Sequence, residues 1–441
     1  MIDIISYSAA ESPVGKLAAI LDRRDGQPAD VEVAVQEILR QVRASGDDAL
    51  VEYTSRFDGV TMTPQSMRVS AKALADAGEA MDPALLAAVR AAAANIRAFH
   101  MKQHTNSWFT EDGDGVILGK RVTPLRRVGI CVPGGQAPLI SSLLMAAIPA
   151  QVAGVEEICV VTPPTRGELP HAEILATAQL LGLSEIYAVG GAQAVGALAF
   201  GTATIPAVDK IVGPGSPYTV AAKRQVFGIV GIEMIPGPSE IAILADDSAD
   251  PRFAAADLLS QAEHGSGHEA AVCIATSQEL ARKIVEEVVA QAESLPRVQA
   301  VREALARYGA VIVVADLDTG VDLLNRIAPE HAELLVKDPW AWLQKIRNAG
   351  AVFLGPASTE PVGDYFAGTN HILPTNGAAR YASSLGLSDF VKTTSVVSYS
   401  AERLRQVGPD IMRIARAEGL EAHARAVQVR LDSGDPKRRS R

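Results

Sequence analysis

The sequence predicts an α/β protein with two blocks of alternating strands and helices. In residues 128–239, short apolar segments such as VGICV and EICVV alternate with segments whose apolar residues have helical spacing. A second alternating block begins at IAILAD and continues through AAVCIAT and AVIVVAD. Buried strands of about 4–8 residues that alternate with helices are typical of βαβ units. Each block therefore predicts a parallel sheet, and two sheets predict a cleft that could hold a small molecule.

The segments before the first block are predicted to be an arm followed by helices. Residues 1–24 form the arm, residues 30–57 a helical region, and residues 83–103 a long alanine-rich helix. In the helical region, apolar residues recur at helical spacing: Val33, Val35, Ile38, Leu39 and Val42.

Capping residues define two helices of the second block. Asp250 is the expected N-cap of a helix with Pro251 at its first position, and Gly265 is the expected stop. Thr276 and Glu279 fit a capping box that opens the next helix.

The end of the chain is predicted to be helical over residues 404–431, with a break at Pro409. The final DSGDPKRRSR is a short basic tail, for which we expect a solvated, disordered segment.

Composition limits the class of protein. A chain of 441 residues predicts two main domains. The net charge of -10 argues against non-specific nucleic-acid binding. We expect no membrane span, because no apolar run reaches about 18 residues, and no secretory signal. Cys131, Cys159 and Cys273 stand in apolar runs, so we expect buried thiols in a reducing compartment and a cytoplasmic protein.

Four groups of polar residues could carry chemistry. Gln261 and His264 are three residues apart, so both project from one face near the end of the predicted helix. They suit a metal, but such a pair is more often two surface polar residues than two ligands. Glu330 and His331 follow Pro329, which disfavours a continuous helix. This pair suits proton transfer, with an exposed polar pair at a helix start as the alternative.

The other two groups lie further along the chain. Asp364 and His371 fall in GDYFAGTNHILPT, which is predicted to be a loop, either functional or merely connecting. Glu418 and His423 fall in a charged segment that could simply be a solvated helix face.

Two further patterns are negative. His100 and His104 have a spacing that could bind zinc, but no acid lies between them, and they are interpreted as surface residues. No GxGxxG motif opens a helix after a strand. These patterns alone indicate an α/β enzyme with a possible His/Asp/Gln metal site, and they do not indicate NAD.

Seven segments together resemble the histidinol dehydrogenase family in order and spacing. They are RVTPLRRVGICVPGGQAPLISSLLMAAIPAQVAGV, VDKIVGPG, AKRQVFGIVGIEMIPGPSE, DLLSQAEHG, NRIAPEHAELL, GDYFAGTNHILPT and EGLEAHARAV. The resemblance extends over almost the whole chain. It implies two incomplete Rossmann-like domains with an N-terminal arm and a C-terminal helical dimerisation segment.

The resemblance also implies a metal site and an acid/base pair. One Zn²⁺ per subunit would be bound by four side chains: Gln261, His264, Asp364 and His423. Imidazole and oxygen ligands suit zinc. His331 would take the alcohol proton as hydride leaves to NAD, and Glu330 would activate a water that adds to the bound aldehyde. The implied reaction takes L-histidinol through L-histidinal to L-histidine in two successive hydride transfers.

Further positions match those that contact small molecules in the family. The substrate positions are Ser239, His371 and Glu418, together with the zinc ligands and the acid/base pair. The NAD positions lie around Cys131, Gln193 and Ser216. Cys131 stands where tyrosine is usual and Ser216 where asparagine is usual.

The resemblance assigns parts of the chain to domains. Residues 25–127 and 240–380 are expected to form the α/β domain with most of the zinc and acid/base site. Residues 128–239 would form the nucleotide-side domain, and residues 381–441 the dimerisation segment and tail. In a homodimer, Glu418 and His423 would serve the partner's site. The alternative is a related zinc and NAD dehydrogenase of another small alcohol, such as a sulfopropanediol.

Overall fold

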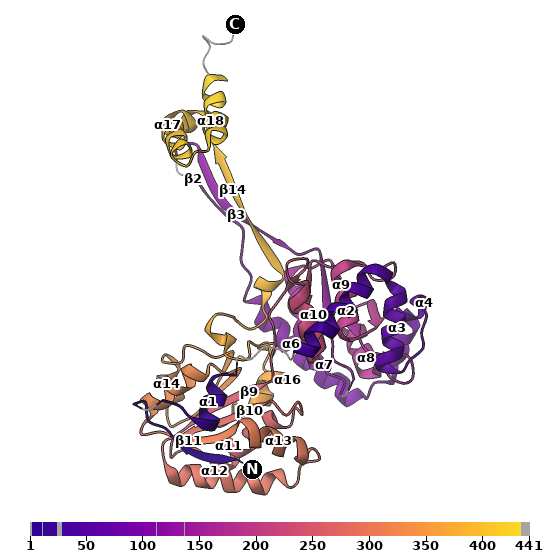
Figure 1. The fold of residues 1–441 in the computed structure, drawn as a ribbon, viewed down its shortest axis with the longest axis vertical. Helices are drawn as coiled ribbons and strands as arrows, with labels where there is room; N and C mark the ends of the chain where they lie inside the picture. The colour runs from indigo at the N-terminus through magenta and orange to yellow at the C-terminus, as the bar shows by residue number, and fades with distance from the viewer. Residues whose placement is uncertain (1, 11, 24–28, 112, 136, 434–441) are drawn as a thin grey trace. The chain divides into compact units, whose positions relative to one another are not determined.

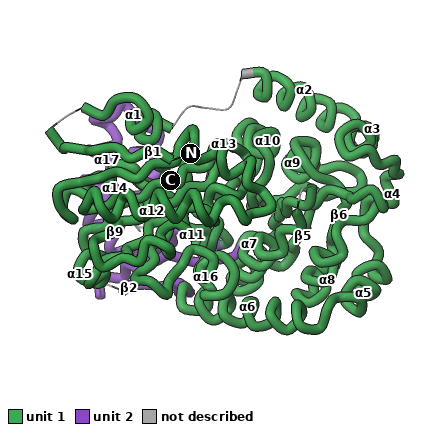
Figure 2. Tube along the Cα trace, turned by 90° about the horizontal axis from the view of Figure 1, so that it is seen from below, with its two compact units in different colours: residues 1–103, 125–390 green, residues 104–124, 391–441 purple. Residues whose placement is uncertain are grey.

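The structure is a computed structural model that describes all residues except 1, 11, 24–28, 112, 136 and 434–441. The chain divides into two compact units (Figure 2). The first comprises residues 1–103 and 125–390, and the second comprises residues 104–124 and 391–441. Most of the predicted basic tail lies outside the described residues.

The first unit contains a parallel sheet of six strands. Their order is β1 (Asp3–Ser6), β11 (Gly309–Val313), β10 (Ala270–Ala275), β9 (Glu240–Ala245), β12 (His331–Leu335) and β13 (Ala351–Leu354). Successive residues of a strand face opposite sides of a sheet, so Ile241 and Ile243 lie in one core, and Ala242 and Leu244 in the other.

Helices cover both faces of this sheet. One core includes α11 (Pro251–Ala262), α12 (Gln278–Ala292) and α13 (Val298–Tyr308). The other includes α1 (Gly15–Leu21) and α14 (Leu317–Ile327). Two short helices flank β13: α15 (Pro339–Leu343) and α16 (Glu360–Tyr365).

The first unit also contains a parallel sheet of five strands. Their order is β6 (Glu185–Ala188), β5 (Glu157–Thr162), β4 (Arg127–Cys131), β7 (Lys210–Val212) and β8 (Gly231–Ile232). One core includes α5 (Ala71–Ala80), α6 (Pro83–Met101), α7 (Ile140–Ala153) and α8 (Ala172–Leu180). The other includes α2 (Ala29–Ser45), α3 (Asp47–Asp58), α9 (Gly191–Phe200) and α10 (Pro217–Val226), and α4 (Pro64–Met67) follows α3. The predicted α/β class with two parallel sheets is confirmed.

The N-terminal helices pack with the five-stranded sheet. Residues 25–127 are predicted to group with 240–380, whereas α2 packs its apolar stripe on α9, in a core of the five-stranded sheet. A Cβ added at Gly196 of α9 would meet Leu39 at 3.1 Å and Val42 at 3.2 Å, so a side chain there would separate the helices. Of the predicted apolar stripe, only Val33 is exposed.

The predicted helix boundaries are partly confirmed. Asp250 caps α11, because its carboxylate accepts the Arg252 backbone N–H at 2.9 Å. The prediction of Thr276 as the next cap is wrong: Ser277 accepts the Leu280 N–H at 3.2 Å and is the N-cap of α12. Both residues have hydroxyls, but the backbone N–H of Thr276 still donates to the Ala245 carbonyl of β9 at 3.1 Å, so the helix begins one residue later.

The second unit combines an antiparallel sheet with a helical hairpin. Its strands are β2 (Trp108–Glu111), β3 (Val116–Pro124) and β14 (Val391–Tyr399), and its helices are α17 (Ala401–Ala417) and α18 (Glu421–Ser433) (Figure 1). The predicted break at Pro409 is wrong, since α17 continues through it. A Cβ added at Gly408 would lie 2.9 Å from Leu431 of α18, so α17 packs closely against α18 at this point.

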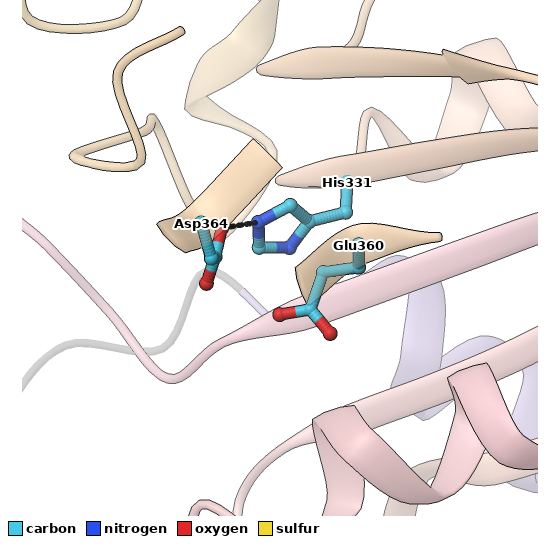
Figure 3. A group of neighbouring side chains, drawn as sticks. All are labelled: His331, Glu360 and Asp364. Carbon is cyan, nitrogen blue, oxygen red and sulfur yellow. Dashed lines mark ion pairs between the residues drawn. The ribbon is translucent and has the colours of Figure 1, made fainter. Parts of the chain in front are cut away.

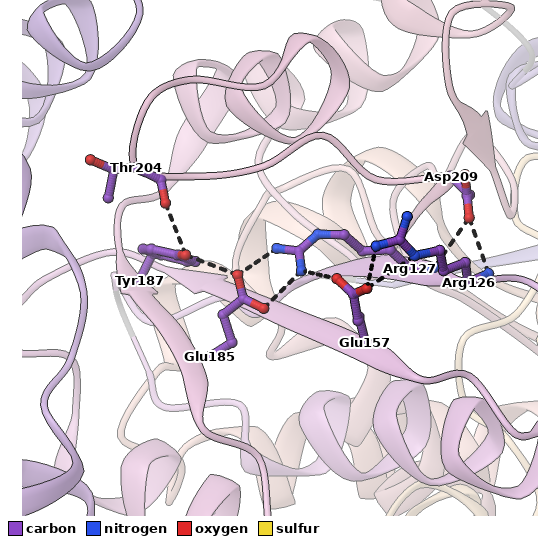
Figure 4. Close-up of polar contacts among 7 residues, drawn as sticks. All are labelled: Arg126, Arg127, Glu157, Glu185, Tyr187, Thr204 and Asp209. Atoms are coloured by element: carbon purple, nitrogen blue, oxygen red, sulfur yellow. Dashed lines mark hydrogen bonds and ion pairs between the residues drawn. The ribbon is translucent and has the colours of Figure 1, made fainter.

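A charge network around the buried Arg127 side chain links strands at the amino edge of the five-stranded sheet (Figure 4). Arg127 at the start of β4 donates from Nη1 to Glu157 at 2.8 Å and to Glu185 at 2.9 Å. The Tyr187 hydroxyl donates to Glu185 at 2.9 Å. This network therefore links the first residues of β4, β5 and β6.

The predicted burial of the three thiols is confirmed. Cys131, Cys159 and Cys273 are buried free cysteines. Among the described residues, no helix has the length and apolar character that crossing a bilayer requires.

Candidate functional site

The candidate acid/base pair lies where two neighbouring strands begin. Glu330 precedes β12, His331 is its first residue, and His331 is in register with Ile241 of β9. Both side chains are buried, with residue exposures of 7% for Glu330 and 3% for His331. The alternative of an exposed pair at a helix start is therefore excluded.

The orientation of His331 is fixed by two oxygen atoms. Its Nδ1 lies 3.1 Å from Oε1 of Gln261 and 3.2 Å from the carbonyl oxygen of Glu240. Because a carbonyl oxygen only accepts hydrogen bonds, Nδ1 carries a hydrogen and donates. In a neutral ring, Nε2 is then the basic nitrogen.

The Glu330 carboxylate faces the same imidazole. Its Oε2 lies 3.7 Å from Nδ1 of His331 and accepts the backbone N–H of Glu240 at 3.0 Å. Burial raises the pKa of Glu330 to about 8. Burial lowers the pKa of His331, but the Glu330 and Asp364 carboxylates outweigh burial and raise that pKa to about 10. Both groups are thus displaced from ordinary values, as is common at catalytic sites.

The imidazole of His331 lies beside two carboxylates, those of Asp364 and Glu360 (Figure 3). Nε2 lies 3.4 Å from Oδ1 of Asp364. One ligand atom from each of His331, Glu360 and Asp364 lies within 4.8 Å of the others, a spacing that could hold a metal ion. Asp364 belongs to α16, so the prediction of a loop throughout this segment is wrong.

The sequence analysis missed Glu360. It is buried in the first turn of α16, where its Oε2 accepts the Ser260 hydroxyl at 2.6 Å. Glu360 and Asp364 are four residues apart, which places them on one face of a helix. That spacing predicts proximity only if the segment is helical, and the segment is predicted from the sequence to be a loop.

The remaining first-unit candidates border this cluster. Gln261 at the end of α11 is fully buried, and its Nε2 lies 3.4 Å from Nδ1 of the exposed His264. His371 is half-buried, and its Nδ1 lies 3.0 Å from the carbonyl oxygen of Asp364. Ser239 directly precedes β9. The structure therefore brings Gln261 and Asp364 together around the imidazole of His331.

Two candidates belong to the second unit. Glu418 is the C-cap of α17, and His423 lies in the first turn of α18. Both are exposed on that unit.

His100 is not the surface residue that the sequence analysis expects. It is fully buried in α6, where its Nδ1 lies 2.8 Å from the Ile96 carbonyl oxygen. His104 is exposed, as expected.

The nucleotide candidates follow strands of the five-stranded sheet. Cys131 ends β4, Gln193 lies in the first turn of α9 after β6, and Ser216 caps α10 after β7. They therefore share the carboxyl edge of the sheet, where open α/β sheets bind ligands. Among the described residues, the buried Oε1 of Gln193 has no hydrogen-bond partner.

Burial and backbone geometry shape this edge. Burial raises the pKa of Cys131 to about 12, so its thiol is protonated and inert at neutral pH. Gly213 has φ +108°, and a Cβ there would lie 2.2 Å from the Cys131 carbonyl oxygen. The buried pair Lys223–Glu233, 2.6 Å apart, bonds both polar backbone groups of Gly213. The GPG turn is therefore rigidly held.

Fold and site together define an α/β enzyme with a buried acid/base pair beside nitrogen and oxygen metal donors. A family model described as histidinol dehydrogenase matches residues 21–431. The chain belongs to the histidinol dehydrogenase family.

Individual relatives agree with the family match. A protein of Geobacillus kaustophilus named histidinol dehydrogenase is 52% identical over 403 residues, which are 91% of this chain and 94% of that protein. One of Heliobacterium mobile with the same name is 46% identical over 98% of this chain and all of its own length. The crystal structure of histidinol dehydrogenase from Elizabethkingia anophelis matches with a TM-score of 0.91 and 37% identity over 98% of both chains.

Proposed function

We propose that the protein is a zinc-dependent, NAD-linked dehydrogenase that oxidises L-histidinol through L-histidinal to L-histidine. The observation that carries the proposal is the buried Glu330–His331 pair beside Gln261 and Asp364, in a chain of this family. A dehydrogenase of an alcohol needs a base for the hydroxyl proton, and this pair supplies one.

Four residues would hold the metal: Gln261, His264, Asp364 and His423. The donor set of two imidazoles and two oxygen atoms suits Zn²⁺. When bound, zinc would supply a positive centre that anchors and orients the substrate's imidazole and amino groups. Gln261 and Asp364 already approach His331, so a substrate anchored there would lie next to the base.

His331 would act in the first oxidation. A metal held by Asp364 would engage one of the carboxylates that raise the imidazole pKa, which favours the neutral ring. Nε2 of the neutral ring would take the hydroxyl proton of histidinol, and NAD would supply the acceptor for the carbon-bound hydrogen as hydride, leaving the aldehyde. The bond from Nδ1 to the Glu240 carbonyl keeps the ring in the required tautomer and orientation.

Glu330 would act in the second oxidation. Its carboxylate would take a proton from a water that adds to the aldehyde, and a second NAD would supply the hydride acceptor for the hydrated aldehyde. Burial of the pair limits access of bulk water to the bound aldehyde between the two steps.

Other residues would bind the small molecules. Ser239, His371 and Glu418 are proposed substrate contacts. NAD would bind near three residues at the carboxyl edge of the five-stranded sheet: Cys131, Gln193 and Ser216. The unpartnered Oε1 of Gln193 is a polar atom that a nucleotide can satisfy.

We further propose a cytoplasmic homodimer in which Glu418 and His423 complete the partner's site. Their exposure on the second unit supports this, because exposed residues are free to reach another subunit.

The test is a comparison of substrates. Purified protein with Zn²⁺ and NAD is assayed for NADH formation on L-histidinol and, separately, on a sulfopropanediol. The proposal expects turnover on histidinol and little on the sulfonate. Turnover confined to the sulfonate would replace the proposed substrate and keep the reaction class.

A further inference from the structure

The N-terminal arm carries an arginine whose side chain is buried beside the site. Arg23 follows α1, and its side chain is 7% exposed. Its Nη1 lies 3.1 Å from Oε1 of Glu240, whose side chain is 5% exposed. The guanidinium also lies over the Tyr308 ring, 4.8 Å from its centroid, and donates to the His268 carbonyl. Arg23 is therefore fixed on several sides.

Glu240 is the residue whose backbone holds the acid/base pair. Its N–H donates to the Glu330 carboxylate at 3.0 Å, and its carbonyl oxygen lies 3.2 Å from Nδ1 of His331. Both contacts come from one peptide segment at the start of β9. A shift of this segment would change the orientation of both side chains at once.

The Glu240 carboxylate is buried and therefore needs a positively charged or hydrogen-bonding partner. Burial raises its pKa, and Arg23 opposes this shift, together with the backbone N–H groups of Asn376 and Glu330. A buried carboxylate that loses its cation either takes up a proton or moves toward water. Movement of the side chain would pull on the backbone that holds Glu330 and His331.

We propose that Arg23 is a positioning residue, which acts through Glu240 to hold Glu330 and His331 in the orientation that proton transfer needs. The inference rests on the proposed function. Arg23 touches neither member of the pair directly in the described contacts, so its effect has to pass through Glu240.

A second polar contact of the same arm, made by Lys16, provides a matched control. Lys16 lies in α1, 2.8 Å from the Asp3 carboxylate and 2.9 Å from the Leu305 carbonyl oxygen. Lys16→Met weakens the docking of the arm without touching Glu240. It therefore separates docking from positioning.

The experiment compares Arg23→Met, Glu240→Gln, the double variant and Lys16→Met, each normalised to zinc content. We expect Arg23→Met to lower kcat about 10- to 100-fold, with KM for histidinol within about threefold, because misplacement of reacting groups acts mainly on the chemical step. In the Glu240→Gln background, the same substitution should cost less than about threefold, because coupled residues are not additive. Lys16→Met should keep kcat near that of the wild type.

A second measurement does not depend on turnover. In protein labelled with ¹⁵N-histidine, the Nδ1–H of His331 should give a hydrogen-bonded resonance that shifts or exchanges faster in Arg23→Met and is unchanged in Lys16→Met. Wild-type protein without histidinol turnover would reject the proposed function, and this resonance would still test the positioning.

Three results would overturn the proposal. They are an unchanged kcat in Arg23→Met, an equal loss in Lys16→Met, and an equal loss in the wild-type and Glu240→Gln backgrounds. If Arg23→Met folds poorly, two variants replace it: Arg23→Lys, and the double variant Arg23→Met with Glu240→Gln. The double variant leaves no buried carboxylate unpaired at this position. We expect Arg23→Lys to retain more activity than Arg23→Met, and the reverse order would also contradict the proposal.

Discussion

At the residue scale, the surroundings of His331 decide what the imidazole can do. Two oxygen acceptors at Nδ1 determine the tautomer, and burial keeps water from competing for Nε2. Glu330 shares this environment, which raises its pKa to about 8. Adjacent residues in the chain thus share one buried environment, and their different side chains can still have distinct roles.

Substitution of each member should separate the two oxidations. His331→Asn should lower the rate of histidinol oxidation about 100- to 10,000-fold, the usual range for loss of a general base. Glu330→Gln should mainly slow oxidation of the aldehyde. Stopped-flow measurement of NADH with histidinol and with histidinal checks both. The exposed His104→Asn is the control, and equal effects of the two variants on both substrates would contradict the separate roles.

The ionisation of Glu330 predicts a pH dependence. Its pKa is raised to about 8, so the carboxyl is protonated below that pH and charged above it. A general base needs the charged form, so the rate of aldehyde oxidation should rise as the pH increases through about 8. Rates with histidinal measured from pH 6 to 10 test this expectation. If the same rise in rate with pH persists in Glu330→Gln, the titration belongs to another group.

The sequence could reveal some site residues and had to miss others. Gln261 and His264 share a helix face, and Glu330 and His331 are adjacent, so their proximity follows from the sequence. Glu240 and Arg23 carry no such signal, because they meet only when β9, β12 and the arm come together. Long-range contacts of this kind depend on topology.

At the scale of elements, the two parallel sheets use opposite edges. The acid/base pair lies at the amino ends of β9 and β12, whereas the nucleotide candidates lie at the carboxyl edge of the five-stranded sheet. The Arg127 network occupies the amino edge of the latter sheet, so we assign it to stability.

Two neighbouring arginines, Arg127 at the start of β4 and Arg126 just before it, provide a matched test of this assignment. The side chain of Arg127 is 9% exposed and that of Arg126 is 76% exposed, although both pair with Glu157. Arg127→Met would leave the Glu185 carboxylate, whose side chain is 19% exposed, without its arginine partner and with the Tyr187 hydroxyl as a donor, and should cost about 1–3 kcal/mol of stability. Arg126→Met should leave the unfolding transition nearly unchanged. Chemical denaturation of both variants checks the difference, and equal transitions would contradict it.

Strand and helix types were predictable, while boundaries and partners were less so. The buried strands follow from their apolar runs, and Asp250 follows from capping chemistry. The choice of Ser277 over Thr276 and the continuity of α17 through Pro409 depend on tertiary packing. The packing of α2 on the five-stranded sheet depends on the small residues of α9. The sequence of α9 does not indicate which helix packs against it.

At the scale of the whole molecule, the proposed zinc ligands are divided between two units. Gln261, His264 and Asp364 belong to the first, and His423 belongs to the second. The proposal that His423 serves the partner subunit makes every site a product of two chains.

Subunit mixing tests this shared site. His331→Asn and His423→Asn should each be nearly inactive as homodimers. In co-expressed mixtures, each heterodimer would have one site with both defects and one intact site. Activity should then recover to about a quarter of the wild-type value, because half of random dimers are mixed. If His423 serves its own subunit, no intact site forms and the mixture stays inactive.

The most direct test of the central claim is NADH formation with L-histidinol and NAD, measured before chelation, after chelation and after restoration of Zn²⁺. We expect activity that is lost with the metal and returns with it, and two NADH for each histidinol consumed. Protein that holds zinc and yet gives no NADH from histidinol would contradict the account.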